Sequence, residues 1–237
     1  MGTIEVIIIS FFAGIATVAG GLIGLILPVE KKGCLGFVIG FGVGVMIGLS
    51  LFSLMPQSYY ITGSALTAAF GFGLGILFMY GCSRFLEFIS PGISKTDGVS
   101  FSKIGMLMAI GIAFHNFPEG IALGAGFQSQ TYLGFVVAFG LLLHNFPEGM
   151  SISAPLKKSR CKTSKIIVIT ALAGAVTPLG AYIGWSVTSG SPLALSIGMS
   201  FAAGAMVYIS FAQVLKLETK YLDLGIFLGI LLTFFLT

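Results

Sequence analysis

The hexapeptide His-Asn-Phe-Pro-Glu-Gly occurs twice in the chain, at His115–Gly120 and His144–Gly149, and these copies contain both of its histidines. Each copy lies inside an otherwise apolar stretch. Imidazole, amide oxygen and carboxylate are all ligands of divalent first-row cations, and a charged carboxylate at the bilayer centre costs roughly 2.5–3.5 kcal/mol on insertion scales. The repetition therefore indicates cation coordination by the two copies together.

The spacing inside each motif suits one face of a helix. Residues four apart share a face, so His115 and Glu119 are expected one turn apart, with Asn116 rotated by about 100° from the histidine. The second copy repeats this pattern with His144, Asn145 and Glu148. The two motifs are separated by a short connection at Gln128–Thr131, which predicts antiparallel neighbouring helices that carry the motifs at similar depth.

Each motif also contains a proline. Pro118 and Pro147 have no amide hydrogen, so they disrupt hydrogen bonds to the carbonyls of Phe114 and Leu143 and are expected to kink the helices. Freed carbonyls at mid-membrane depth are tolerated where they line a cavity or find a partner. Bent helices with polar residues at their centres are typical of a substrate site.

Two other interpretations of the motifs stay open at this point. Protonated glutamates at Glu119 and Glu148 could share hydrogen bonds with His115 and His144, or the motifs could form a structural polar clamp between helices. Two identical copies holding the only histidines favour a bound cation. A mixed histidine and carboxylate set suits zinc, iron or manganese better than magnesium or calcium, which prefer oxygen ligands.

Composition fixes the setting of these motifs. Hydrophobic residues make up 56% of the chain, charged residues 8%, and the mean hydropathy is +1.05, whereas soluble domains carry roughly 25% charged residues. We therefore expect an all-α membrane protein forming one domain over residues 1–237, surrounded by lipid. Eight apolar runs of membrane-spanning length are predicted at about 4–27, 34–55, 63–88, 103–127, 131–155, 164–187, 192–215 and 220–237.

The basic residues predict the orientation. All 12 Lys and Arg residues fall around alternate connections, those between spans 1 and 2, 3 and 4, 5 and 6, and 7 and 8. Because basic loops stay on the cytoplasmic side, both termini are expected to be extracytoplasmic. The same distribution explains the net charge of +4 without a nucleic-acid partner, which would require basic residues clustered with aromatic ones.

Small residues and an internal echo predict how the spans pack. Gly36, Gly40, Gly44 and Gly48 form a ridge on span 2, which meets either another helix or a second copy of the chain, so a homodimer is a candidate assembly. The segment from Gly44 in span 2 resembles the segment from Gly204 in span 7. With the hexapeptides in spans 4 and 5, this echo predicts a 3+2+3 inverted repeat.

The motif pair, the eight spans and the outside termini resemble the ZIP (Zrt-, Irt-like protein) family of divalent-metal transporters, and the segment Gly44–Pro56 resembles its bacterial GufA-like branch. The resemblance implies a prokaryotic cytoplasmic-membrane transporter with no resident cofactor and with zinc as the favoured substrate, ahead of iron, manganese or cadmium. It implies a primary site formed by His115, Glu119 and Glu148. It further implies a second site that shares the glutamates and adds Asn116 and Asn145, with His144 beside them.

The resemblance also implies pathway positions, where this chain departs from the family pattern. Met46 and Ser53 match pathway-lining positions of span 2. Thr177 stands where span 6 commonly carries a glutamate, and Gln213 stands where span 7 often has His-Glu. We therefore predict one tight metal site and a weak or empty second one.

Three rival functions use the same residues. A proton or monovalent-cation channel and a non-transporting metal receptor could both be built on these carboxylates. An intramembrane metal-dependent hydrolase would need an open ligand position and a separate general base, and the sequence contains no His-Glu-x-x-His motif. The protein is therefore not expected to be an enzyme.

Overall fold

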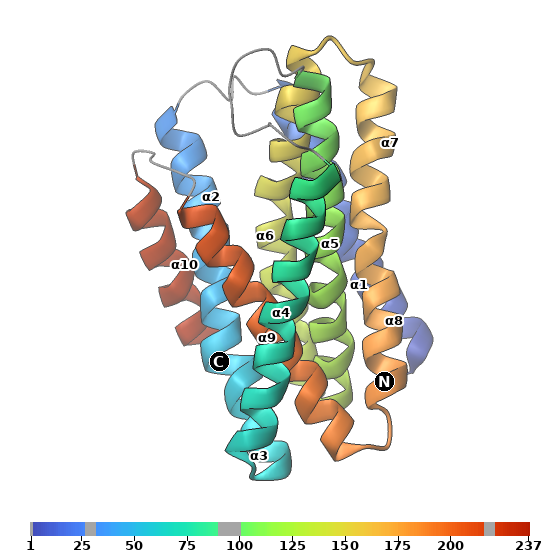
Figure 1. Ribbon diagram of the computed structural model, residues 1–237, viewed down its shortest axis with the longest axis vertical. Helices are drawn as coiled ribbons and strands as arrows, with labels where there is room; N and C mark the ends of the chain where they lie inside the picture. The colour runs from blue at the N-terminus through green and yellow to red at the C-terminus, as the bar shows by residue number, and fades with distance from the viewer. Residues whose placement is uncertain (1, 27–31, 90–100, 216–220) are drawn as a thin grey trace.

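The protein is an all-helical bundle, seen in Figure 1 with its long axis vertical. The computed structural model describes residues 2–26, 32–89, 101–215 and 221–237, with only the backbone described for residues 32–35. Its helices are α1 (Thr3–Ile26), α2 (Lys32–Gly48), η1 (Leu49–Leu54), α3 (Met55–Thr62), α4 (Ala65–Ile89), α5 (Phe101–Ser129), α6 (Thr131–Lys158), α7 (Thr163–Gly174), α8 (Val176–Thr188), α9 (Pro192–Val214) and α10 (Leu222–Leu236).

Within the described residues, seven helical segments are long and apolar enough to cross a membrane. They agree with the first seven predicted spans, and the second is the one that differs most, because its helix continues to Thr62 where the sequence predicted an end near residue 55. The last helix, α10, is apolar but has only 15 residues, and at 1.5 Å per residue it is shorter than ~30 Å of hydrocarbon.

Two helices change geometry partway along. The second span contains a π-helical stretch at η1, between α2 and α3, and such π-helical insertions are frequent at functional sites. The sixth span is broken at Ala175 between α7 and α8. The break lies within the four residues before Pro178, which cannot donate a backbone hydrogen bond to Gly174.

The two motif prolines behave differently from Pro178. Helices α5 and α6 run without interruption through Pro118 and Pro147, and both prolines are buried. A single extended residue, Gln130, separates these helices, which pack against each other. The predicted antiparallel pair is confirmed.

The glycine ridges pack within this chain. A Cβ at Gly40 or Gly44 would collide with the backbone carbonyl of Leu222 or Ile226, so the ridge on α2 meets α10. On α1, Gly20 abuts the carbonyl of Phe146 in α6. Close backbone approach of this kind is how membrane helices associate when lipid is as apolar as their side chains.

The helix contacts come in matching pairs. Helix α1 packs on α6 and α8 packs on α5, while α10 packs on α2 and α4 packs on α9. The central helices also reach outward in the same way, since α5 contacts α9 and α6 contacts α2. Each of these contacts made by the first part of the chain thus has a counterpart made by the last part.

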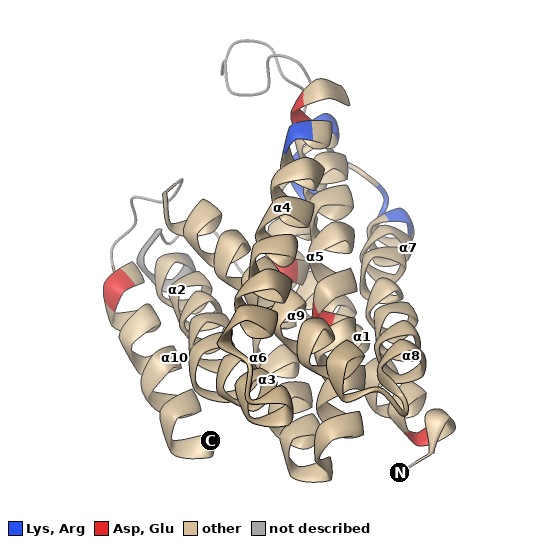
Figure 2. Ribbon diagram, turned by 60° about the horizontal axis from the view of Figure 1, so that its bottom comes forward, with Lys and Arg blue, Asp and Glu red and all other residues tan. Residues whose placement is uncertain are grey.

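Charge is distributed unevenly along the bundle. Both chain ends lie at the lower end in Figure 1. In Figure 2 the described Lys and Arg residues gather at the opposite end, which we call the basic end, and acidic positions also occur in the middle of the bundle. Four of the basic residues that predict the orientation lie outside the described residues, namely Lys31, Lys95, Lys216 and Lys220.

Candidate metal centre

The two hexapeptides bring their acidic and imidazole groups to one place between α5 and α6. Glu119, His144 and Glu148 each offer a ligand atom, and these atoms all lie within 4.8 Å of one another. His144 Nε2 is 3.2 Å from Glu148 Oε1 and 3.6 Å from Glu119 Oε1. The side chains of all three are at most 3% exposed.

His115 joins this cluster from the other motif. Its Nδ1 lies 3.6 Å from Glu148 Oε1, the same separation as that between His144 and Glu119. Each motif therefore places its histidine next to the glutamate of the other motif. The difference is exposure, since the His115 side chain is 21% exposed and that of His144 is 2% exposed.

The separations suit one shared cation. Ligand atoms held at about 2.0–2.2 Å from a tetrahedral Zn²⁺ lie roughly 3.3–3.6 Å from each other. The three imidazole-to-carboxylate distances of 3.2, 3.6 and 3.6 Å are within a few tenths of an ångström of that value. A small inward movement of the side chains would therefore complete the coordination sphere.

Two of these distances argue against a purely structural polar clamp. A hydrogen bond between imidazole and carboxylate needs a donor–acceptor distance of roughly 2.7–3.2 Å with good alignment, so the two contacts at 3.6 Å are too long and the contact at 3.2 Å lies at the limit. All four carboxylate oxygens of Glu119 and Glu148, and both ring nitrogens of His144, are buried without a hydrogen-bond partner among the described residues. Buried unpaired carboxylates are costly unless a cation compensates them, so the donor set fits a divalent metal.

The two asparagines tie the cluster to the flanking helices. Asn116 Nδ2 donates to the carbonyl of Ala173 in α7 at 2.9 Å, and Asn145 Nδ2 donates to the carbonyl of Ala13 in α1 at 2.8 Å. Both side chains are fully buried, and each Oδ1 lacks a hydrogen-bond partner among the described residues. The Nδ2 atoms thus form hydrogen bonds between helices, whereas the Oδ1 atoms have no hydrogen-bond partner among the described residues.

The four expected pathway residues lie in different surroundings. Met46 is fully buried and belongs to the apolar core. Ser53, in η1, and Thr177, in α8, are buried with hydroxyls that find no hydrogen-bond partner in the described part of the chain. Gln213 is half-buried near the end of α9.

Thr17, the equivalent of Thr177, was not among the residues predicted from the sequence. Its hydroxyl is fully buried and has no hydrogen-bond partner among the described residues. The signal was present, since Ala-Gly-x-x-Thr-x-x-Gly-x-x-x-Gly occurs at Ala13–Gly24 and again, 160 residues later, at Ala173–Gly184. The same interval separates Gly44 from Gly204.

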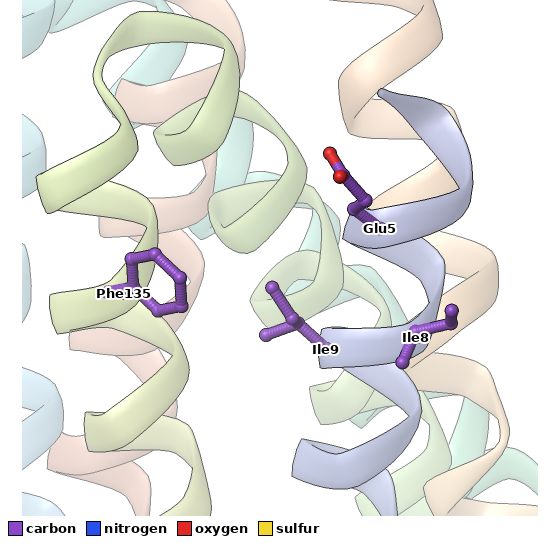
Figure 3. Close-up of a pocket in the computed structure, with 4 residues that line it drawn as sticks. All are labelled: Glu5, Ile8, Ile9 and Phe135. Carbon is purple, nitrogen blue, oxygen red and sulfur yellow. The ribbon is translucent and has the colours of Figure 1, made fainter. Parts of the chain in front are cut away.

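A groove lies between α1 and α6, nearer the terminal end of the bundle. Glu5, Ile8, Ile9 and Phe135 line it, Ile9 points toward Phe135 in Figure 3, and the volume of the groove is ≈400 Å³. Phe135 precedes His144 by nine residues, or about 14 Å of helix. The groove is therefore separate from the cluster, and the hydrogen bond of Asn145 to Ala13 lies at the level of the cluster, between His144 and Glu148 on α6.

Comparison with known proteins agrees with this arrangement. The family model for the ZIP zinc transporter matches residues 93–237, more than half of the chain, including both hexapeptides. The chain belongs to the ZIP family. Among ZIP relatives, the zinc transporter ZupT of Chlorobium limicola is 36% identical over 234 residues, covering 90% of this chain and 87% of that protein. ZupT of Escherichia coli O7:K1 is 30% identical over 222 residues, covering 90% and 86%.

Within this ZIP protein the compact cluster differs from the ligand set that the resemblance implied. That set contains His115, whereas the tightest grouping in the structure contains His144 with Glu119 and Glu148. Among the described residues, His115 lies within ion-pair distance of one glutamate, Glu148. His115 is included in the candidate metal centre because its Nδ1 lies 3.6 Å from Glu148 Oε1.

Proposed function

We propose that this protein carries divalent transition-metal cations, zinc foremost, across a membrane through the centre formed by His115, Glu119, His144 and Glu148. One observation carries the proposal. Glu119, His144 and Glu148 are buried at ligand spacing, with His115 3.6 Å from Glu148. The four carboxylate oxygens, both His144 nitrogens and His115 Nδ1 lack hydrogen-bond partners among the described residues. The names of the zinc-transporting relatives support zinc as the cargo.

The membrane architecture is part of the proposal. We assign α10 as the eighth span, because it packs closely against α2, a predicted span, along the glycine ridge of that helix. The basic end is assigned to the cytoplasm, so that both termini are extracytoplasmic. The bacterial relatives support the cytoplasmic membrane of a prokaryote as the location.

The paired helix contacts support a 3+2+3 inverted repeat. The 160-residue interval relates α1 to the α7–α8 pair and α2 to α9, while 29 residues separate the two hexapeptides. The paired contacts follow the same correspondence: replacing α1 and α6 by their counterparts α8 and α5 turns the contact of α1 with α6 into that of α8 with α5. Inverted repeats of this type allow a central site to face either side in turn.

The geometry supports access from the basic end. His115 precedes Glu119 on α5, which starts at the basic end, and it is the only one of the four centre side chains described as more than 3% exposed. On the other side, the Asn145–Ala13 hydrogen bond closes α1 against α6. In this mechanism an ion loses water to the centre, and the helices that carry it (α1, α5, α6 and α7–α8) change exposure against the others.

Protons compete with the metal at this centre. Imidazole and carboxylate groups must be deprotonated to coordinate, so metal binding releases protons and weakens as the pH falls. We therefore expect the transport rate to fall when the pH is lowered on the side from which the ion binds. This coupling follows from ligand chemistry alone.

Transport by purified protein in lipid vesicles tests the proposal. We expect saturable Zn²⁺ uptake, competition by Cd²⁺, Fe²⁺ and Mn²⁺, and loss of uptake in the Glu119→Ala, Glu148→Ala double variant. The matched control is Glu87→Ala, which removes a carboxylate that is 64% exposed and paired with Arg84. Uptake that survives in the double variant contradicts the assignment.

The same vesicles separate the rival functions. A proton or monovalent-cation channel would dissipate a pH or potassium gradient without metal selectivity. A metal receptor would bind Zn²⁺ without carrying it into the vesicles. Either result would replace transport as the function of this centre.

A further inference from the structure

Two side-chain hydrogen bonds join the helices that carry the metal centre to the rest of the bundle. We call α1, α5, α6 and α7–α8 the carrier helices, and α2, η1, α3, α4, α9 and α10 the frame. Gln57 Nε2, in α3 of the frame, donates to the Oγ of Ser129 in α5 at 2.9 Å. Tyr132 Oη, in α6, donates to the carbonyl of Leu236 in α10 of the frame at 2.6 Å. Both bonds therefore cross the boundary between the two groups of helices that the proposed mechanism moves against each other.

Both bonds lie at the tip of the α5–α6 pair. Helix α5 ends at Ser129 and α6 begins at Thr131, with Gln130 between them. This tip lies at the end of the bundle where the chain termini are, because Tyr132 bonds the next-to-last residue of the chain, and Figure 1 draws α3 at the same end. The tip is therefore held to two separate helices of the frame, at the end opposite the basic one.

Other side-chain hydrogen bonds tie the carrier helices to one another. Gln128 donates to the carbonyl of Trp185 in α8 at 3.4 Å, and Lys157 Nζ donates to the carbonyl of Leu25 in α1 at 2.6 Å. Lys157 follows Gln128 by 29 residues and Trp185 follows Leu25 by 160, which are the two intervals of the internal repeat. The carrier helices are thus tied together at both ends of the bundle, whereas the two bonds to the frame lie at one end.

The bonds to the frame depend on where the carrier helices lie. A hydrogen bond is lost once its donor and acceptor separate by more than roughly 0.5–1 Å beyond its normal length. If the carrier helices move against the frame, the tip moves with them, because Gln128 ties it to α8. A contact that forms in one state and is absent from the other stabilises the first state. The two bonds therefore stabilise the arrangement seen in the structure.

We propose that the Gln57–Ser129 and Tyr132–Leu236 bonds form a tip latch, which must release before the metal centre opens toward the chain termini. The inference rests on the proposed function, because it takes the movement of the carrier helices from it. It adds two contacts that set how often the centre opens at that end. An average interhelical hydrogen bond in a membrane protein changes an equilibrium by about threefold, so the two together change it by about eightfold.

A cysteine at position 141 reports opening at the tip. Leu141 lies three residues before His144 on the same face of α6, one turn nearer the tip, and its side chain is fully buried. Leu141→Cys is made in a protein whose own cysteines, Cys34, Cys82 and Cys161, are changed to serine. A membrane-impermeant thiol reagent is added on the side of the chain termini. When closing is faster than labelling, the labelling rate of the metal-free protein measures the population that is open at this end.

Gln57→Leu and Tyr132→Phe each remove one bond of the tip latch. We expect each change to raise the labelling rate by about threefold, and the two together by about eightfold. Ser129→Ala should have the same effect as Gln57→Leu. Combining these two changes should add nothing further, because both remove the same bond.

Gln128→Leu and Tyr182→Phe are the matched controls. Gln128 has the residue type of Gln57 and lies at the same tip, but its bond to Trp185 stays within the carrier helices. Tyr182 is an exposed tyrosine of α8, and among the described residues its hydroxyl makes no hydrogen bond to the frame. Neither control should change the labelling rate. Thermal melting of each variant shows that it is folded.

Two results would overturn the tip latch. One is labelling at the wild-type rate, or no labelling at all, in the variant that lacks both bonds. The other is an equal increase in the two controls, which would indicate general loosening of the tip. The labelling needs no metal, so in both cases Zn²⁺ uptake that depends on Glu119 and Glu148 leaves the proposed function intact.

Discussion

The two copies of the hexapeptide have the same sequence but lie in different surroundings. His115 and His144 are each 3.6 Å from the glutamate of the other motif, and Asn116 and Asn145 each donate to an alanine carbonyl. Yet the His144 side chain is 2% exposed and also lies 3.2 Å from Glu148, whereas that of His115 is 21% exposed.

The difference between the copies originates in the neighbouring helices. His144 lies against α2 at Gly42, where no side chain intervenes. The position 160 residues later on α9 is Ala202, which is fully buried and carries a Cβ. Identical motifs thus give matching contacts from one motif to the other, while only His144 also contacts the glutamate of its own motif and lies against a glycine of a neighbouring helix.

The largest effect should separate the two histidines. Because His144 contacts both glutamates and His115 contacts one, we expect His144→Ala to weaken Zn²⁺ affinity by about 100-fold or more and His115→Ala by about tenfold. Isothermal titration of both purified variants measures this. The family resemblance implies the reverse order, so a greater loss in His115→Ala would show that the sequestered histidine is not the stronger ligand.

A smaller effect is expected from the space at Gly42. In Gly42→Ala the new methyl group would lie 2.8 Å from His144 Nδ1 and 3.6 Å from Pro147 Cγ. The imidazole is buried and cannot move aside freely, and overpacking of this kind costs about 1–3 kcal/mol. We expect Zn²⁺ affinity to fall about tenfold, measured by the same titration.

Gly81→Ala controls for the change of residue type. A Cβ at Gly81 meets no heavy atom of the described residues within 4 Å, so this helical glycine should accept alanine with no loss of affinity. If Gly42→Ala binds Zn²⁺ as tightly as Gly81→Ala does, the close packing of His144 against Gly42 of α2 does not affect the metal centre.

Most of the candidate centre was predictable from the sequence. The repeated hexapeptide fixed the residue types, the i and i+4 spacing and the antiparallel pairing, because these depend on local helix geometry and a short connection. The structure brings the predicted side chains together between α5 and α6. The glycine ridges were also recognised, and the structure supplies their partners on α6 and α10.

Other features depend on tertiary contacts that a local pattern does not contain. The break before Pro178 occurs at a helix crossing, although Pro118 and Pro147 sit inside continuous helices. The exposure of His115 depends on packing by other helices. Thr17 was missed because a threonine among small apolar residues has no distinctive chemistry until its 160-residue counterpart is aligned with it.

The smallest effect should show where the two motifs remain equivalent. Asn116→Ala and Asn145→Ala each remove one interhelical hydrogen bond of nearly the same length, 2.9 and 2.8 Å, from a fully buried side chain. Such bonds in membrane proteins contribute about 0.6 kcal/mol on average and up to about 1.7. Both variants, free of metal, should therefore lower the free energy of unfolding by about 1 kcal/mol in a denaturation series. Ser151→Ala, which removes a hydroxyl that donates to Pro147 within its own helix, should lower it less. If the two asparagine variants lose clearly different free energies of unfolding, the two motifs differ in their interhelical hydrogen bonds as well as in the exposure of their histidines.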